Sequence, residues 1–483
     1  MALAERAEQT EHRSEQSTVS EQSTVAVTPT ATTAGRTWPR LRVTARGSII
    51  AALLVFTLVK QLILIAAYPP FQGHDEVGHY GYLWTMEHFE RLPTLGDNMP
   101  IVLDPYSMYT LDWPAVYTAN HPPGYYLLLY KIMTWAGTDV AGDLLPRLYA
   151  LRLASVLPFL LAIWLTYLLA RTLFPRDLFL TLTAPAAVAL APQLSFEGAI
   201  INNDILSICW GTLLLYLCAS ALRHGLTWRR ALAFGVALGT GLLIKATLTI
   251  FLPIAALVAV WCRWPRPWGA IRTRAYWRGT LTAAAAMLLP ALTIPAPWYA
   301  FLYRTYGDFS AFTAIQNLQQ YWNIPAGTFT ELLFSKEFHL ERIREYVGYF
   351  GWKLIPLTAW QARVTYGALI LFGVGLLVGL GRVAWRWRTG QRPETVQIVG
   401  VALLVVANLV MYGAMIYFGT MFRLTQARYI FPVAGATALL AMLGLRAFLP
   451  ERFLRPAAAL AIAAFTAFNL WLFLGGVLPY AFL

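Results

Sequence analysis

Long apolar stretches recur along this chain from Ser48 to the C-terminus, with shorter polar segments between them. A helix of about 20 residues crosses the roughly 30 Å hydrocarbon layer of a bilayer, so these stretches predict membrane spans. Ten-residue segments of alternating polarity are absent, which favours a helical bundle over a β-barrel. Eleven spans are predicted, at residues 48–68, 150–170, 179–196, 205–222, 231–246, 247–262, 279–300, 364–381, 395–418, 429–446 and 457–480.

The amino-acid composition indicates that most of the chain is surrounded by lipid rather than by water. Of its 483 residues, 58% are hydrophobic and only 13% are charged, whereas soluble domains carry about 25% charged residues. The predicted fold class is therefore an all-α, polytopic membrane bundle. The three cysteines, Cys209, Cys218 and Cys262, lie inside apolar stretches without CxxC spacing. We interpret them as packing residues rather than disulfide or metal ligands.

The first residues differ in character from the rest of the chain. Residues 1–35 contain the tandem "SEQSTVSEQSTV" and almost no aromatic residues, which predicts disorder. No apolar core precedes Ser48, so a cleavable signal peptide is not expected. We predict a disordered, basic-ended cytoplasmic tail at 1–47 and a single transmembrane domain at 48–483. Its two long external loops are 69–149 and 301–363, and the first should contain helices that lie in the membrane interface.

The distribution of charge predicts the orientation. With a cytoplasmic N-terminus, the internal segments hold 21 basic and three acidic residues, and the external segments hold 12 basic and 16 acidic residues. Basic residues concentrate on the cytoplasmic side of membrane proteins and contact anionic lipid there. The net charge of +13 thus predicts an integral plasma-membrane protein rather than a nucleic-acid partner. Lys60 and Arg152 fall inside predicted spans and each needs a buried partner.

Polar residues from six separate segments fall at the predicted extracytoplasmic ends of the spans. Asp75 and Glu76 follow "PPFQG", where two prolines end the first helix. We assign catalytic roles to Asp75 and Glu76, because a carboxylate held there suits a general base or a cation ligand; a solvated loop is the alternative. His74 and His79 flank the pair without further ligands at metal-site spacing, so no metal site is predicted. The two acids still leave room for a divalent cation.

Cations at the same ends suggest an anionic ligand. Arginine and lysine suit phosphate oxygens, with lipid headgroups as the alternative ligand. We assign donor-phosphate binding to Arg152, Lys245, Arg423 and Arg428. The hydrogen-bonding residues beside them suit a sugar or an acceptor, although Asp204 could simply cap a helix. These residues are His79, His121, Asn203 and Asp204.

Two motifs carry a resemblance to a known family. The stretch "HDEVGHYGY" at 74–82, followed by "HPPGYYLL" at 121–128, resembles the protein O-mannosyltransferases and their bacterial relatives among the GT-C membrane glycosyltransferases. Later pieces, "NNDIL", "LLIKATL" and "QARYIFPV", are similar to the bacterial branch. The sequence departs from the mannosyltransferase form where Gly78 precedes His79, and it lacks the soluble insertions of the eukaryotic enzymes.

The resemblance implies a reaction and a set of roles. It implies transfer of a sugar from a polyprenyl-phosphate donor to an extracytoplasmic hydroxyl of a glycan, lipid or protein. Inversion in a single displacement and no required cofactor are also implied. Asp75 is similar to the loop carboxylate that orients or deprotonates the acceptor, and Glu76 is similar to its neighbour. Arg152 and Arg428 match cations of the family, the latter a phosphate contact.

Two functions of other classes compete with the enzyme. A transporter or flippase of lipid-linked sugars predicts internal repeats and polar residues near the bilayer midplane. A non-catalytic scaffold gives no reason for Asp75, Arg152 and Arg428 to gather at one end. Charges concentrate at that end and no clear repeat is found, so we favour the glycosyltransferase.

Overall fold

The computed structural model describes residues 45–97, 117–137, 144–264, 268–318, 325–351, 353–422 and 425–482. Contacts divide the chain into Met1–Thr44 and Ala45–Leu483, and every described residue lies in the second unit. In the described part of that unit, the regular structure is helical apart from one short antiparallel hairpin, in which Tyr349 pairs with Pro356 and Phe350 with Ile355. The organisation into a tail and a single membrane domain stays a prediction.

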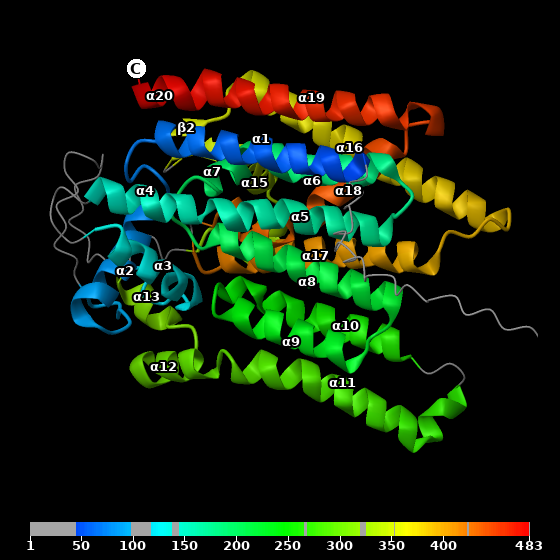
Figure 1. Cartoon of the computed structure of the whole chain (residues 1–483), viewed down its shortest axis with the longest axis horizontal. Helices are drawn as coiled ribbons and strands as arrows, with labels where there is room; N and C mark the ends of the chain where they lie inside the picture. Colours follow the sequence, from blue (N-terminus) through cyan, green and yellow to red (C-terminus); the bar gives the residue numbers. More distant parts are fainter. Residues whose placement is uncertain are drawn as a thin grey trace, which may run out of the picture. The chain divides into compact units, whose positions relative to one another are not determined.

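The first half of the unit alternates long helices with short ones (Figure 1). α1 ends before the Pro69–Pro70 pair, and Pro192 begins a new helix after α6, because a proline restricts the residue before it. The elements are α1 (Ala45–Ala67), α2 (Glu76–Phe89), α3 (Gly124–Trp135), α4 (Leu144–Ala154), α5 (Val156–Leu173), α6 (Leu178–Leu190), α7 (Pro192–Glu197), α8 (Asp204–His224), α9 (Trp228–Leu242), η2 (Ala246–Ile250) and α10 (Phe251–Arg263).

The second half contains the hairpin and the longest helices. The side chain of Thr358 caps α16 by accepting from the backbone N–H of Gln361, whose side chain bonds back to Thr358. The elements are η3 (Trp268–Arg272), α11 (Arg274–Thr293), α12 (Ala296–Tyr306), α13 (Phe312–Leu318), α14 (Phe329–Phe334), α15 (Lys336–Val347), β1 (Tyr349–Phe350), β2 (Ile355–Pro356), α16 (Ala359–Arg388), α17 (Thr395–Gly419), η4 (Ala427–Val433), α18 (Ala434–Arg446), η5 (Glu451–Phe453), α19 (Leu454–Leu472), η6 (Phe473–Val477) and α20 (Leu478–Phe482).

The predicted helical membrane bundle is confirmed, but the predicted number of spans is not. Among the described residues, eight helices are long and apolar enough to cross a membrane, or nine if the pair α11 and α12, bent by 42°, is one span. Helices also occupy the predicted spans 179–196 and 231–246. They are short, because α6 has 13 residues and α9 has 15. The predicted number of eleven spans is therefore not confirmed.

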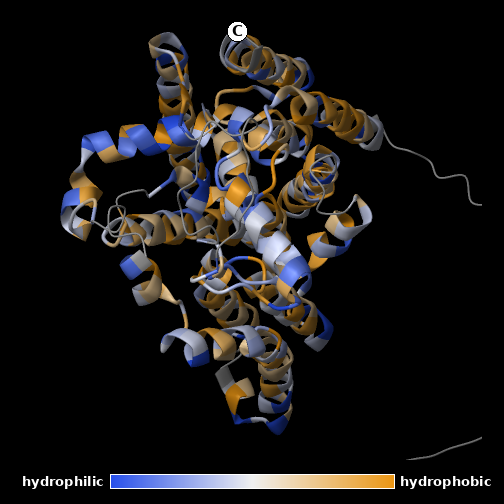
Figure 2. Cartoon of the chain, turned by 90° about the vertical axis from the view of Figure 1, so that its left-hand side faces the viewer, coloured by the Kyte–Doolittle hydropathy of each residue, from blue (hydrophilic) through white to orange (hydrophobic). Residues whose placement is uncertain are grey.

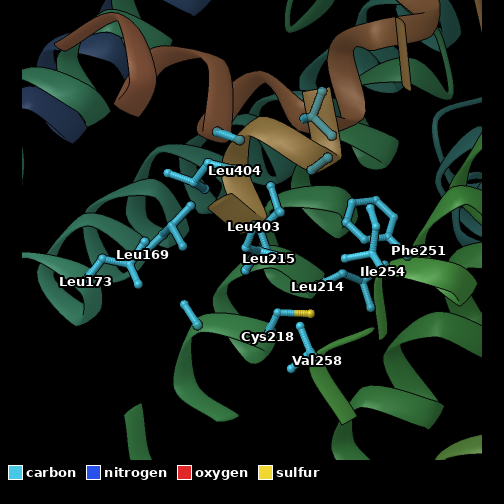
Figure 3. Packing of buried hydrophobic residues seen from close by; sticks show 14 of the residues in the cluster. Leu169, Leu173, Leu214, Leu215, Cys218, Phe251, Ile254, Val258, Leu403 and Leu404 are labelled. Carbon is cyan, nitrogen blue, oxygen red and sulfur yellow. The ribbon is translucent and has the colours of Figure 1, made fainter. Parts of the chain in front are cut away.

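The largest apolar core joins α5, α8, α10 and α17. Figure 3 shows its packing, with Leu169 and Leu173 from α5 near Leu214 and Leu215 from α8, and Leu403 from α17 beside them. The three cysteines are free thiols in apolar surroundings, as predicted. Gly211 of α8 lies against the carbonyl oxygen of Pro432. A side chain there would collide with that backbone, so the glycine lets η4 pack directly on α8.

The sequence led to one prediction about Lys60 and another about the helices of the first external loop. Lys60 has the structural partners expected for it, since its Nζ donates to the carbonyl of Ala189 at 2.5 Å and to Ser195 Oγ at 2.6 Å. Residues 76–86 of α2, in the predicted first external loop, are all buried, because side chains from α3, α4 and α12 cover the helix in one apolar cluster. The expectation that helices of this loop lie in the membrane interface stays a prediction.

Candidate active site

A cavity of about 790 Å³ lies at the end of the helices where α2, α3 and α13 meet. Figure 2 looks onto this end, where polar stretches lie between apolar helices. Segments far apart in the sequence line the cavity. Five predicted site residues are among its lining: Asp75, His121, Asn203, Lys245 and Arg428. The predicted residue Arg423 lies outside the described residues.

Asp75 reaches the cavity from the residue before α2. Its backbone is left-handed, with φ 57°, a conformation that Asp and Asn tolerate better than most residues. The carboxylate accepts a hydrogen bond from the Tyr117 hydroxyl at 3.0 Å and forms an ion pair with Arg428. Burial raises the pKa of Asp75, but the charge of Arg428 and its hydrogen bond to the carboxylate outweigh this effect. The pKa is therefore held well below its usual value, and Asp75 is ionised at neutral pH.

Four charged residues from four segments form one chain of ion pairs. Arg428, at the start of η4, contacts Asp75 and also lies 3.7 Å from Asp204 Oδ2. Lys245, in the connection between α9 and η2, pairs with Asp204 and donates to Asn203 Oδ1 at 3.3 Å. The order Asp75, Arg428, Asp204, Lys245 alternates in sign, so each charge is balanced by a neighbour. Asp204 supports both cations although it is not itself part of the cavity lining.

Two histidines share a tyrosine beside this chain. His79 Nδ1 lies 2.8 Å from the Tyr126 hydroxyl, and His121 Nδ1 lies 3.2 Å from the same oxygen. Asn203 Nδ2 is 3.4 Å from His121 Nδ1. Burial, and then the charge of Lys245, lowers the pKa of His121 to about 4. Burial also lowers the pKa of His79. Both imidazoles are neutral at pH 7, and His121 alone of the two lines the cavity.

The pKa of His121 predicts a window of pH-dependent stability. An unfolded histidine binds its proton near pH 6.5, whereas folded His121 stays neutral down to about pH 4. The unfolded state therefore binds more protons in this interval, and stability falls as pH is lowered from 6.5 to 4. Thermal unfolding of the purified protein across this range should show the decline. His121→Gln should make the decline shallower, with His79 contributing the remainder because its pKa is also lowered. An equally steep decline in that variant would contradict the assignment.

Glu76 and Arg152 form a separate, fully buried ion pair. Arg152 donates to both carboxylate oxygens of Glu76, at 2.8 and 2.7 Å, and to the carbonyls of Tyr68 and Pro69, each at 2.8 Å. Glu76 also accepts from the backbone N–H of Ile201 at 3.1 Å. Neither residue lines the cavity. The catalytic and phosphate-binding roles predicted for them stay untested, and the geometry favours a role in holding Asp75 in place.

Several cavity residues were missed at the sequence level. Tyr117 bonds Asp75, and Lys353 lines the cavity from the turn between β1 and β2 while pairing with Glu345. Glu345 accepts from the backbone N–H of Ala427 at 2.9 Å, which fixes the residue before Arg428. Gly351 and Lys353 both have positive φ, and this backbone conformation places Lys353 in the cavity wall. The only sequence signal was the "YFGW" stretch, which does not reveal its distant partners.

An aromatic strip in the cavity wall runs from Phe312 to Tyr429, next to the cations. Ring centroids of Phe312 and Phe422 are 5.0 Å apart, and Phe418 lies 4.7 Å from both Phe422 and Tyr429. Lys245 Nζ is 6.0 Å from the centroid of the Tyr429 ring. All of these aromatic residues line the cavity. It therefore combines an apolar surface with adjacent positive charges, as an amphiphile with an anionic head requires.

Three ligand-type side chains lie close together beside Asp75. Ligand atoms of His74, Glu197 and Asp204 lie within 4.8 Å of one another, and His74 Nε2 is 3.1 Å from Glu197 Oε2. Imidazole and carboxylate are ligands of zinc and manganese. A cation there would compete with Arg428 and Lys245 for Asp204. The group thus leaves a divalent cation open without establishing one, and it includes the His74 that sequence spacing left without further ligands.

Part of the chain matches a known protein family. The family model described as dolichyl-phosphate-mannose-protein mannosyltransferase matches residues 120–294. This segment contains His121, Asn203, Asp204 and Lys245, whereas Asp75 and Arg428 lie outside it. No curated protein sequence matches the chain.

Three solved structures are similar to this chain, and the similarity to ArnT indicates a shared fold. ArnT from Cupriavidus metallidurans, bound to undecaprenyl phosphate, is 16% identical with a TM-score of 0.50, covering 91% of this chain and 74% of ArnT. The apo oligosaccharyltransferase of Archaeoglobus fulgidus is 18% identical with a TM-score of 0.46, covering 89% of this chain and 55% of that one. The S. cerevisiae protein O-mannosyltransferase Pmt1-Pmt2 complex, bound to the sugar donor, is 18% identical with a TM-score of 0.39, covering 55% and 34%.

Proposed function

We propose that this chain, a GT-C membrane glycosyltransferase related to the protein O-mannosyltransferases, moves a sugar from a polyprenyl-phosphate donor to an acceptor hydroxyl. The acceptor is approached from the extracytoplasmic side, and the N-terminus is cytoplasmic. One observation carries the proposal: Asp75 and Arg428 face each other in a cavity that also holds Lys245 and an aromatic strip. A carboxylate base and phosphate-binding cations are the two parts that such a transfer needs.

The donor fits this cavity in one orientation. Its phosphate binds at Arg428 and Lys245, and its hydrocarbon follows the strip of Phe312, Phe422 and Phe418. ArnT binds undecaprenyl phosphate, which is the same class of ligand. His121 and Asn203 are placed to hydrogen-bond the sugar. Protein as the acceptor remains one choice among glycan, lipid and protein.

The reaction is a single displacement with inversion. The acceptor oxygen attacks the anomeric carbon while the bond from that carbon to the phosphate oxygen breaks, and the polyprenyl phosphate leaves with the electron pair. Asp75 takes the hydroxyl proton. Arg428 and Lys245 stabilise the charge that develops on the departing phosphate, where preorganised cations lower the barrier most.

Donor binding also prepares the base. With Arg428 paired to Asp75, the low pKa makes the carboxylate a weak base. A donor phosphate competes for the same guanidinium, and weakening that pair raises the pKa of Asp75 toward working pH. Proton removal is thereby coupled to the presence of the donor, which limits side reactions in its absence.

A flippase for the lipid-linked sugar is the competing function. It would need a polar path through the bilayer, whereas the cavity gathers its charges at one end of the helices. The two functions differ in product. A transferase releases free polyprenyl phosphate, while a flippase changes only the leaflet in which the intact lipid-linked sugar is found.

Loss of the Arg428 charge provides the test of the proposal. Arg428→Gln should reduce transfer by about 10²-fold, because one donor to the developing charge is lost. Release of polyprenyl phosphate from membranes supplied with lipid-linked sugars, read by mass spectrometry, measures the effect. Arg363→Gln is the matched control, since Arg363 is an exposed arginine of α16 outside the cavity lining. Leaflet exchange without phosphate release in the wild-type protein would overturn the transferase.

A further inference from the structure

A second cavity, of about 340 Å³, lies at the other end of α10 from the candidate active site. α10 follows η2, which begins beside Lys245, and ends at Arg263. In Figure 1 this far end is where α10 ends and α11 begins, away from α2 and α3. The cavity walls come from Leu226 in the connection between α8 and α9, from the end of α10, from η3 and from residues 276–287 of α11. The proposed transfer reaction uses none of these residues.

Two polar atoms in this cavity are without a partner. Arg263 Nε and Thr280 Oγ1 are shielded from solvent and have no hydrogen-bond partner among the described residues. Other contacts fix Arg263: its Nη2 donates to the carbonyl of Leu226 at 2.9 Å, and its own carbonyl accepts from the Tyr276 hydroxyl at 3.0 Å. Buried donors left without acceptors are unfavourable. A ligand that offers acceptor oxygens at this point is therefore favoured.

The surrounding charge selects an anion. Residues 263–278 contain five arginines and no acidic residue. Arg272, Arg274 and Arg278 are exposed around the cavity. Basic pockets between membrane helices bind the anionic headgroups of lipids. A phosphate group meets both requirements, because it is negatively charged and carries several acceptor oxygens.

The remaining walls select a ligand with a hydrocarbon chain. Beyond Thr280 the α11 wall continues through Ala283, Ala284 and Met287. The outer face of the same helix exposes Leu281 and Leu289 by 63% and 61%, as a lipid-facing helix does. The exposed Trp264 and Trp277 are typical of the level of lipid headgroups. The cavity thus opens where the polar and apolar layers of a bilayer meet.

We propose that this cavity binds one anionic glycerophospholipid. Its phosphate lies at Arg263 and Thr280, and one acyl chain follows Ala283 and Met287. The lipid fixes the end of α10 against the beginning of α11. Since α11 continues through the bend into α12, whose Trp298 and Tyr299 line the other cavity, the bound lipid supports that wall from a distance.

Lipid retention tests the proposal on the full chain. The purified, delipidated protein is titrated with phosphatidylglycerol or phosphatidylcholine of identical acyl chains, and adducts are counted by native mass spectrometry. Tight binding of one phosphatidylglycerol is expected, weakened about fivefold in Arg263→Gln. Arg388→Gln, which removes an exposed arginine at the end of α16, away from the cavity lining and from residues 263–278, should change it less than twofold. Thr280→Val should also weaken retention, and it keeps the test available if Arg263→Gln fails to fold.

Three outcomes would overturn the proposal. They are equal retention of phosphatidylcholine, unchanged retention in both Arg263→Gln and Thr280→Val, and displacement of the lipid by inorganic phosphate alone. The last would mean that the site takes free phosphate. Because lipid binding is measured without sugar transfer, none of these outcomes decides the proposed transferase function, which is tested separately.

Discussion

Asp75→Asn is expected to reduce sugar transfer by about 10³-fold, in the middle of the range found for general bases. The amide keeps the shape of the side chain and can still accept from Tyr117, but it cannot take the proton of an acceptor hydroxyl. Arg428 retains Asp204 as a neighbour, so the protein should remain folded. Initial rates of polyprenyl phosphate release, with thermal unfolding on the same sample, measure both effects.

The control for this variant is Asp97→Asn. Asp97 belongs to the same predicted loop, pairs with Arg91 at 2.6 Å, and does not line the cavity. Its variant should transfer sugar at close to the wild-type rate. Wild-type turnover in Asp75→Asn would remove the assignment of the base, whatever the behaviour of Asp97→Asn.

Glu76→Gln, unlike Asp75→Asn, should cause a large loss of stability. Arg152 is fully buried and Glu76 is its carboxylate partner. Removing one member of a buried ion pair typically costs about 3–5 kcal/mol, since the other charge is left uncompensated. We expect a markedly lower thermal midpoint and a lower yield of folded protein. The exposed Glu90 at the end of α2 supplies the control Glu90→Gln, which should change little.

A rescue separates the charge from the shape of that pair. Glu76→Gln combined with Arg152→Met removes both charges, and well-packed neutral pairs are often as stable as buried ion pairs. The double variant should recover part of the lost stability. If Glu76→Gln instead stays stable and loses only turnover, the residue belongs to the chemistry, as the family resemblance implied.

The position of the site was largely predictable from the sequence. Asp75, Lys245 and Arg428 fall at the same predicted ends of their spans, and a membrane helix carries its end residues to a common level. The orientation of neighbouring side chains was not predictable in this way. Asp75 and Glu76 are adjacent, yet one lines the cavity and the other pairs with Arg152. That difference depends on the left-handed turn at Asp75, which the "PPFQG" stretch only suggests.

Contacts between distant segments account for what the sequence did not reveal. Glu345 accepts a hydrogen bond from the backbone N–H of Ala427. Ala427 lies in the "QARYIFPV" stretch, but Glu345 belongs to no motif that the sequence analysis recognised. The aromatic strip draws on α13, α17 and η4 and on the connection after α17, and its phenylalanines look like ordinary lipid-facing residues when they are read singly. The number of spans stays unconfirmed for a related reason, because hydropathy does not report that α6 ends at Leu190 and that a new helix begins at Pro192.

The φ of 57° at Asp75 restricts which replacements natural drift can fix there. Side chains branched at Cβ are strained in this conformation, whereas Asn and Gly are accommodated. Homologues that have lost the proposed activity should therefore carry Asn or Gly at this position rather than a random residue. Such a substitution would mark an inactive paralogue whose architecture is otherwise intact.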